Sequence, residues 1–162
     1  MAQIEFLLSD IMDKIHLESA YIGAKAMGTD SSAFERISTI EADEDMCEKF
    51  ITDTFPILES TLSRYDCLCE RYDEDDVISF TVSLSLPLNF SGTDKGLEDA
   101  FKDYIAKKVF AEWVMLSKAG NYEYYFGKAT ESLQALRMYL TMRDKPIRKE
   151  PTTIKYKKTT YE

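Results

Sequence analysis

The chain has 162 residues, of which 44% are hydrophobic and 12% aromatic, and its formal net charge is −9. This length and composition are typical of one globular domain with a real core, and they exclude an intrinsically disordered chain. No apolar run approaches the roughly 20 residues of a membrane-spanning helix. The first residues also lack the basic start of a signal peptide. We therefore expect a protein that is made and used in the cytoplasm and has no membrane partner.

The charge is divided unevenly along the chain. Residues 143–162 carry seven basic and three acidic side chains, a net charge of +4, whereas residues 1–142 carry 13 basic and 26 acidic side chains, a net charge of −13. The sequence predicts one domain, residues 1–146, followed by a basic extended tail, residues 147–162. The tail favours phosphate contacts, but the acidic body would repel nucleic acid. An acidic protein surface, including that of a neighbouring copy, would attract the same tail.

The amino-terminal half reads as a series of helices. Residues 3–26 form the first predicted helix, because apolar residues recur at helical spacing from Ile4 to Ile22. Ser32 and Glu35 have the spacing of a capping box, which predicts a short helix over about 33–38. A longer helix is predicted over about 40–64, and Pro56 should kink or divide it.

A β-hairpin follows, over about 66–86. Apart from the step from Val77 to Ile78, residues 77–86 alternate between apolar and Ser or Thr side chains, which is the clearest strand signal in the chain. The acidic turn Asp73–Asp76 suits the hairpin loop. Because an isolated two-stranded hairpin is marginal in water, it must either pack on its own helices or pair with strands of another chain. The sequence leaves both alternatives open.

Two long helices folded back on each other are predicted over about 93–142. Thr93 or Asp94 should cap the first, Gly120 should end it, and Asn121 should begin the second. Their apolar stripes are broad, and a fraction of the tyrosines, among them Tyr124 and Tyr125, are candidates for a subunit interface. Beyond Pro146 the tail is rich in β-forming residues, so it is either disordered or a strand that pairs with another chain.

No motif in the sequence indicates catalysis. Glycine-rich phosphate loops and a nucleophile elbow are absent, and the single histidine, His16, has no second histidine for proton relay or metal binding. Cys67 and Cys69 could begin a metal site, but with one other cysteine, Cys47, a four-ligand zinc set would need carboxylates. We therefore expect buried or half-buried free thiols, no metal ion, no cofactor and no enzymatic activity.

The order of the segments resembles that of the small, mainly helical head–tail connector proteins (neck or adaptor ring) of tailed bacteriophages and related prophages. Helices come first, then a β excursion, a long helix with a helical return (94–142) and a basic tail that begins Arg143-x-x-Pro146-x-Arg148. The resemblance implies a ring, often of twelve copies, stacked under the portal in the virion. It also implies contacts with other neck or tail proteins, and a channel that DNA traverses without sequence-specific binding.

We thus expect a mainly α protein: a helical bundle with a helical hairpin, one β-hairpin and an extended carboxyl-terminal tail. The predicted function is a non-enzymatic connector subunit of the virion that assembles through its β-hairpin and tail. An alternative is a cytosolic helical adaptor or regulatory domain that binds a partner protein through the tail. The candidate interaction residues are Phe80, Val82, Leu84, Arg143, Arg148, Ile154, Tyr156, Lys157 and Lys158.

Overall fold

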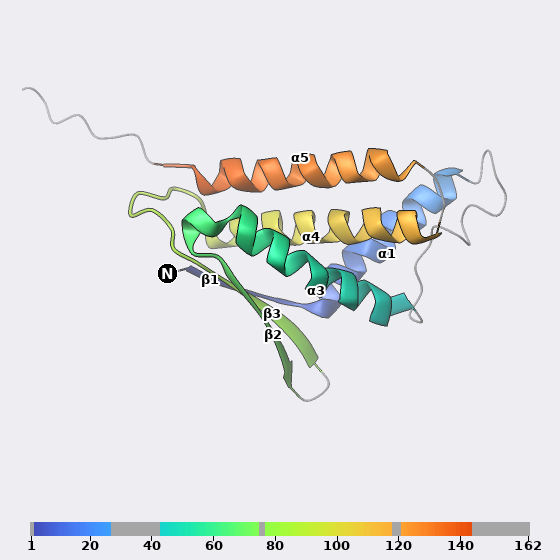
Figure 1. The fold of residues 1–162 in the computed structure, drawn as a ribbon, viewed down its shortest axis with the longest axis horizontal. Coiled ribbons are helices and arrows are strands. Elements are labelled where there is room, and N and C mark those ends of the chain that lie inside the picture. Colours follow the sequence, from blue (N-terminus) through green and yellow to red (C-terminus); the bar gives the residue numbers. More distant parts are fainter. Residues whose placement is uncertain (1, 27–42, 75–76, 118–120, 144–162) are drawn as a thin grey trace, which may run out of the picture.

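The computed structural model describes residues 2–26, 43–74, 77–117 and 121–143. Within these ranges the chain is mainly helical, as predicted, with a small antiparallel sheet (Figure 1). The elements in chain order are β1 (Ala2–Leu7), α1 (Leu8–Ala26), α3 (Glu44–Thr61), the short 3-10 helix η2 (Ser63–Tyr65), β2 (Leu68–Glu74), β3 (Val77–Leu84), α4 (Asp94–Ser117) and α5 (Tyr122–Leu140). The short helix predicted over about 33–38, with its capping box, and the tail 147–162 lie outside the described residues.

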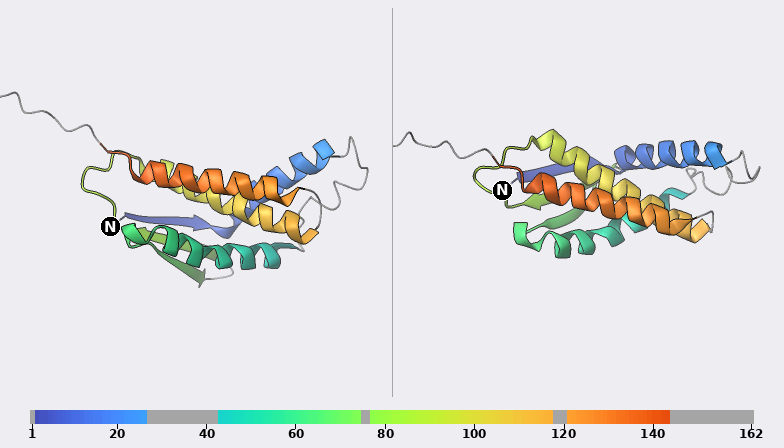
Figure 2. Two further views of the ribbon diagram at one scale, coloured as in Figure 1. Left: turned by 45° about the horizontal axis from the view of Figure 1, so that its top comes forward. Right: turned by 90° about the horizontal axis from the view of Figure 1, so that it is seen from above.

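Helix α4 lies at the centre of the fold. It packs against α5 on one side and against α1, α3 and β1 on the other, and the two views of Figure 2 show α5 as the outermost layer. Among the described elements, α4 is the only one with which α5 makes an extended contact. The broad apolar stripe predicted for the long helix is explained by this position, because α4 buries side chains toward two layers at once.

The amino terminus differs from the prediction. Residues 2–7 form strand β1, and the helix begins only at Leu8, so a helix that starts at residue 3 is wrong for the first five of its residues. Ile4 and Phe6 point inward, 5% and 2% exposed, while the alternate residues Gln3, Glu5 and Leu7 are exposed. This period of two is that of a strand, and pairing with β3 stabilises it.

The sheet has the strand order β1–β3–β2, and both pairings are antiparallel. Strand β3 is therefore central, with Ile4 opposite Val82 and Phe6 opposite Phe80 on one side. The third strand beside the hairpin comes from the amino terminus of the same chain, a source that neither alternative named.

Aromatic side chains join the sheet to the helices. The ring of Phe80 lies 6.0 Å from that of Phe6 and 5.2 Å from that of Phe55 on α3, measured between centroids. The Phe55–Phe80 pair has an edge-to-face geometry, which aromatic quadrupoles favour. Burying side chains of this size stabilises the fold by roughly 1.5–3 kcal/mol each.

The helix ends agree with the predicted caps where they are described. The Oγ1 of Thr93 accepts a hydrogen bond from the backbone N–H of Gly96 (3.1 Å), and the side chain of Asn121 accepts one from Tyr124 (3.3 Å). Gly120 lies outside the described residues. Pro56 lies within α3 without dividing it.

A polar contact fixes α5 on α4. The Oγ of Ser132, which is buried in this interface, donates to the Oδ2 of Asp103, and Lys107 Nζ lies 2.7 Å from the same oxygen. Burial opposes the charge of Asp103, but the hydrogen bonds from Lys107 and Ser132 outweigh it and hold the pKa of the carboxyl below its ordinary value.

Replacing Phe6 by Ala tests the strand assignment. We expect the free energy of unfolding, measured by urea denaturation, to fall by about 3–5 kcal/mol, because a buried aromatic ring leaves a cavity. Leu7→Ala is the matched control, since Leu7 is 39% exposed on the opposite face, and it should cost less than about 1 kcal/mol. Equal losses at the two positions would contradict the strand.

Replacing Asp103 by Asn tests the contact between α4 and α5. The free energy of unfolding at pH 7 should fall by about 1 kcal/mol, a modest loss because the carboxylate is partly exposed to solvent. A carboxyl with a lowered folded-state pKa stabilises the protein above its unfolded-state pKa, and this contribution disappears as the pH falls through the folded-state value. The difference between wild type and variant should therefore shrink below about pH 4. A difference that grows toward acid would contradict this assignment.

Candidate interaction surfaces

The outer face of the sheet is defined by the strand register. Glu5 and Glu70 lie opposite Thr81 from its two sides, and Leu7 and Tyr72 flank Ser79 in the next row. Because side chains alternate along each strand, these rows share one face, while the buried residues Ile4, Phe6, Phe80 and Val82 share the other. The helices pack on the buried face, so the rows of Glu5 and Leu7 belong to the open one.

This outer face is acidic and partly apolar. By the register it carries three carboxylates, from Glu5, Glu70 and Glu74, and no lysine or arginine among its described residues. Tyr72 and Val77 are 43% and 52% exposed. A shallow hollow of about 480 Å³ runs across the face, lined by Gln3, Glu5, Leu7, Tyr72, Glu74, Val77, Ser79 and Thr81. Figure 1 shows that the hairpin of β2 and β3 extends beyond the helical layer.

Hydrogen bonding holds part of this face in place. The hydroxyl of Tyr72 donates to Glu70 Oε2 (2.8 Å), and this bond raises the pKa of Tyr72. The phenol is thus fixed as a donor to a carboxylate. The remaining lone pairs of that carboxylate can accept from a cationic partner.

The free edge of β2 is partly closed. The backbone N–H of Cys69 donates to Glu59 Oε1 on α3 (2.9 Å), so this N–H points away from β3 and is already bonded. Next along the strand, Arg71 forms an ion pair with Glu48 (2.7 Å). Such side chains limit pairing of an edge strand with another chain.

The predicted interaction residues of the hairpin lie inside the protein. Phe80, Val82 and Leu84 are brought together on the central strand, and each is 0% exposed. Their side chains pack in this chain's own core, because strand β1 and the helices cover them. The intermolecular contact that we predicted for these three side chains does not fit this fold. The residues that do face outward on β1 were missed because the segment was assigned to a helix.

The predicted residues of the tail are mostly outside the described ranges. Arg143 is exposed and forms an isolated antiparallel bridge with Phe90, and Ser91 donates from its backbone N–H to Met142 (3.3 Å). These contacts fix the point where the tail leaves α5. Arg148, Ile154, Tyr156, Lys157 and Lys158 belong to the residues that the structure does not describe.

A second surface, rich in tyrosine, lies where α1, α4 and α5 meet. Tyr21 and Tyr124 are 69% and 57% exposed, and beside them is an apolar hollow of about 260 Å³. Its floor is Phe110, which meets the ring of Tyr125 edge to face at 5.1 Å between centroids, and Lys128 Nζ lies 5.7 Å from the ring of Tyr124. Tyr124 is thus available at the surface, while Tyr125 is half-buried, and the subunit interface predicted for these tyrosines stays a prediction.

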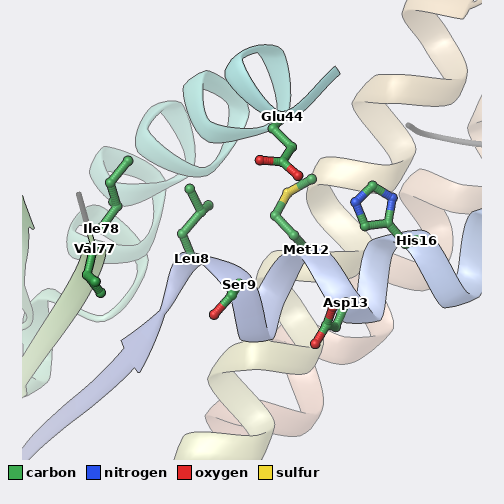
Figure 3. Close-up of a pocket in the computed structure, with 8 residues that line it drawn as sticks. All are labelled: Leu8, Ser9, Met12, Asp13, His16, Glu44, Val77 and Ile78. Atoms are coloured by element: carbon green, nitrogen blue, oxygen red, sulfur yellow. The ribbon is translucent and has the colours of Figure 1, made fainter. Parts of the chain in front are cut away.

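A third hollow, of about 380 Å³, separates α1 from the start of α3 and from β3. Figure 3 shows that His16 on α1 and Glu44 on α3 are among the residues that line it, while the side chain of Asp13 points away from both. Across the described part of the chain, no group of three or more His, Cys, Asp or Glu side chains is arranged to hold a metal ion.

The three cysteines are free thiols, as predicted. Cys47 and Cys67 are buried and Cys69 is half-buried. Burial, with Asp43 and Glu44 nearby, raises the pKa of Cys47 to about 12. A thiol in this environment stays protonated near neutral pH and is a poor nucleophile.

Glu59→Ala tests whether Glu59 closes the edge of β2. Removing the carboxylate leaves the N–H of Cys69 without its acceptor, so we expect its hydrogen exchange, followed by NMR, to accelerate at least about tenfold. Asp53→Ala, at an exposed site on the same helix, should leave that rate unchanged. If Cys69 remained protected in the first variant, another group would close the edge.

No helix in the described ranges is long and apolar enough to cross a membrane. Comparisons of this chain with protein-family models, with curated proteins and with solved structures find no match.

Proposed function

We propose that this chain is a non-enzymatic structural subunit that associates head to tail with copies of itself. As its biological form we propose the ring of a head–tail connector or neck in a tailed bacteriophage, which the layout of the chain resembles. The observation that carries the proposal is the open, acidic outer face of the sheet. It is lined by half-exposed apolar side chains, which are typical of sites where proteins bind one another, and by carboxylates, which can pair with a cationic partner.

The arrangement of the layers supports a head-to-tail contact. The sheet packs its inner face toward α4, and α5 packs on another side of α4 (Figure 2). The outer face of the sheet and the start of the basic tail, after Arg143, therefore lie on different layers. Two different surfaces that bind each other form a heterologous contact, and such contacts close into rings when the rotation between copies permits.

The charge distribution supports the same function. Residues 1–142 carry a net charge of −13, and residues 143–162 a net charge of +4. Opposite charges on two parts of one chain favour association between copies, with a strength that falls as salt is added. An acidic wall also suits a channel that DNA traverses, because like charges prevent adhesion.

The basic tail also favours a second function, a helical adaptor that binds one acidic partner protein in the cytosol. Deleting residues 147–162 separates the two. In a connector the deletion abolishes association between subunits, whereas in an adaptor it leaves a folded monomer that has lost one partner. The readout is native mass spectrometry, with thermal unfolding to show that the domain remains folded.

The proposal is tested on assembled particles. Electron microscopy and mass spectrometry of purified virions should locate the chain in multiple copies below the portal, with about twelve expected from the resemblance. A recombinant chain that forms no closed ring would not be decisive, because connector subunits often close into rings only on a template. A chain that is missing from the particles, and stays monomeric with its natural neighbours present, would rule the connector function out.

A further inference from the structure

We infer that the outer face of the sheet is the receptor for the basic segment 152–159 of a second copy of this chain. The inference deepens the proposed function and rests on it for the identity of the partner, since it names the two surfaces that meet. The evidence for it is that the acidic and apolar side chains of the outer face, which the structure describes, complement the basic and apolar residues in the sequence of the segment.

The face presents its charges and apolar groups in rows. The row of Glu5, Thr81 and Glu70 has a carboxylate at each end, and the next row has Leu7 and Tyr72 at its ends. Glu74 follows beside Val77. Rows on one face of a sheet are about 6.6–6.8 Å apart. The two acidic rows are therefore about 13 Å apart, with an apolar row between them, and a partner that fits this surface must supply cationic groups to both acidic rows and apolar groups to the row between.

The segment 152–159 combines cationic and apolar residues. Its sequence is Thr-Thr-Ile-Lys-Tyr-Lys-Lys-Thr, so Lys155 and Lys157 alternate with Ile154 and Tyr156. In an extended chain, residues two apart are about 6.6 Å apart along the strand. Lys155 and Lys157 lie on the same side of such a segment, and their long, flexible side chains can reach apart to the two acidic rows while their apolar stems cover the row between them. The segment carries three lysines and no acidic residue.

A second copy is the partner that the fold favours. Arg143, the last described residue, bridges to Phe90 beside the end of α5. Helix α5 contacts α4, and the sheet lies beyond α4 with its outer face turned away. The tail starts at the end of α5 and the receptor face belongs to the sheet, so a contact between copies joins two different surfaces and is heterologous.

The binding test uses a fluorescent peptide of residues 147–162. The receptor is the full chain with Lys155, Lys157 and Lys158 changed to Glu, so that its own tail does not compete for the face. We expect anisotropy to show binding with a Kd on the order of 10 μM at low salt, and about tenfold weaker binding at 0.3 M salt because exposed charges are screened. No binding at low salt overturns the inference.

Charge reversal on the face locates the site. Adding Glu5→Lys and Glu74→Lys to the receptor should weaken peptide binding at least tenfold. Asp53→Lys with Glu123→Lys is the matched control, because it changes the net charge equally at exposed positions on α3 and α5, and it should weaken binding by less than about threefold at 0.15 M salt. If the two receptors lose equal affinity for the peptide, net charge alone attracts it. That result overturns the assignment of the outer face as the binding site.

Milder variants guard against misfolding. Glu5→Gln with Glu74→Gln keeps the side-chain shape and should weaken peptide binding about threefold to fivefold. The melting temperature of this receptor should stay close to that of the parent receptor. If this pair binds the peptide as tightly as the parent receptor, the carboxylates are not part of the site.

The final measurement decides which copy supplies the segment. At concentrations well above the peptide Kd, the wild-type chain should self-associate in analytical ultracentrifugation, and the variant with reversed tail lysines should not. If the wild-type chain remains monomeric at these concentrations while the peptide binds the tail-reversed receptor, the segment folds back on the sheet of its own chain. That result overturns the inference that a second copy supplies the segment. These measurements use purified protein and not virions. They can therefore support the contact between copies even if the chain is absent from phage particles.

Discussion

The pairing of β1 with β3 is the contact on which the rest of the structure depends. A hairpin of β2 and β3 alone would be marginal in water, and the third strand turns it into a sheet with one covered face. The pairing places Phe6 opposite Phe80, and Phe80 in turn contacts Phe55 on α3. Because β1 runs directly into α1, the same contact also sets the direction in which the first helix leaves the sheet.

Helix α4 extends this arrangement into layers. It buries Leu97, Phe101 and Ile105 in the same core as the sheet. Helix α5 reaches this core with Leu136 and Leu140. Since α5 has no other extended contact among the described elements, its position depends mainly on α4, with additional contacts from Phe90 and Ser91 at its carboxyl-terminal end. The polar contact between Asp103 and Ser132 then fixes the relation of two faces that apolar packing alone would leave free to slide.

The sequence predicted the helices that the structure describes, because each has an apolar stripe of helical period that does not depend on distant contacts. Strand β1 was missed for a physical reason. Ile4, Leu8 and Ile11 are spaced as on a helix, yet Ile4 and Phe6 also alternate as on a strand, and only pairing with residues about eighty positions away selects the strand. The outer face was missed with it, since Glu5 joins Glu70 only through the register of β3. The alternation in β3 indicated one apolar and one polar face, but it did not show that helices of the same chain cover the apolar face.

The same acidic face serves two physical purposes. Glu5 and Glu70 stand on either side of Thr81 with no basic side chain in their row. Two strand spacings separate them, about 9.5 Å, which is close to the Debye length at physiological salt, so they repel weakly. Two such faces would repel each other, and this discourages stacking of sheet on sheet. A cationic segment placed between the two carboxylates removes this repulsion as well as adding its own attraction. Repulsion toward the wrong partner and attraction toward the right one therefore arise from the same residues, and the specificity exceeds what either effect supplies alone.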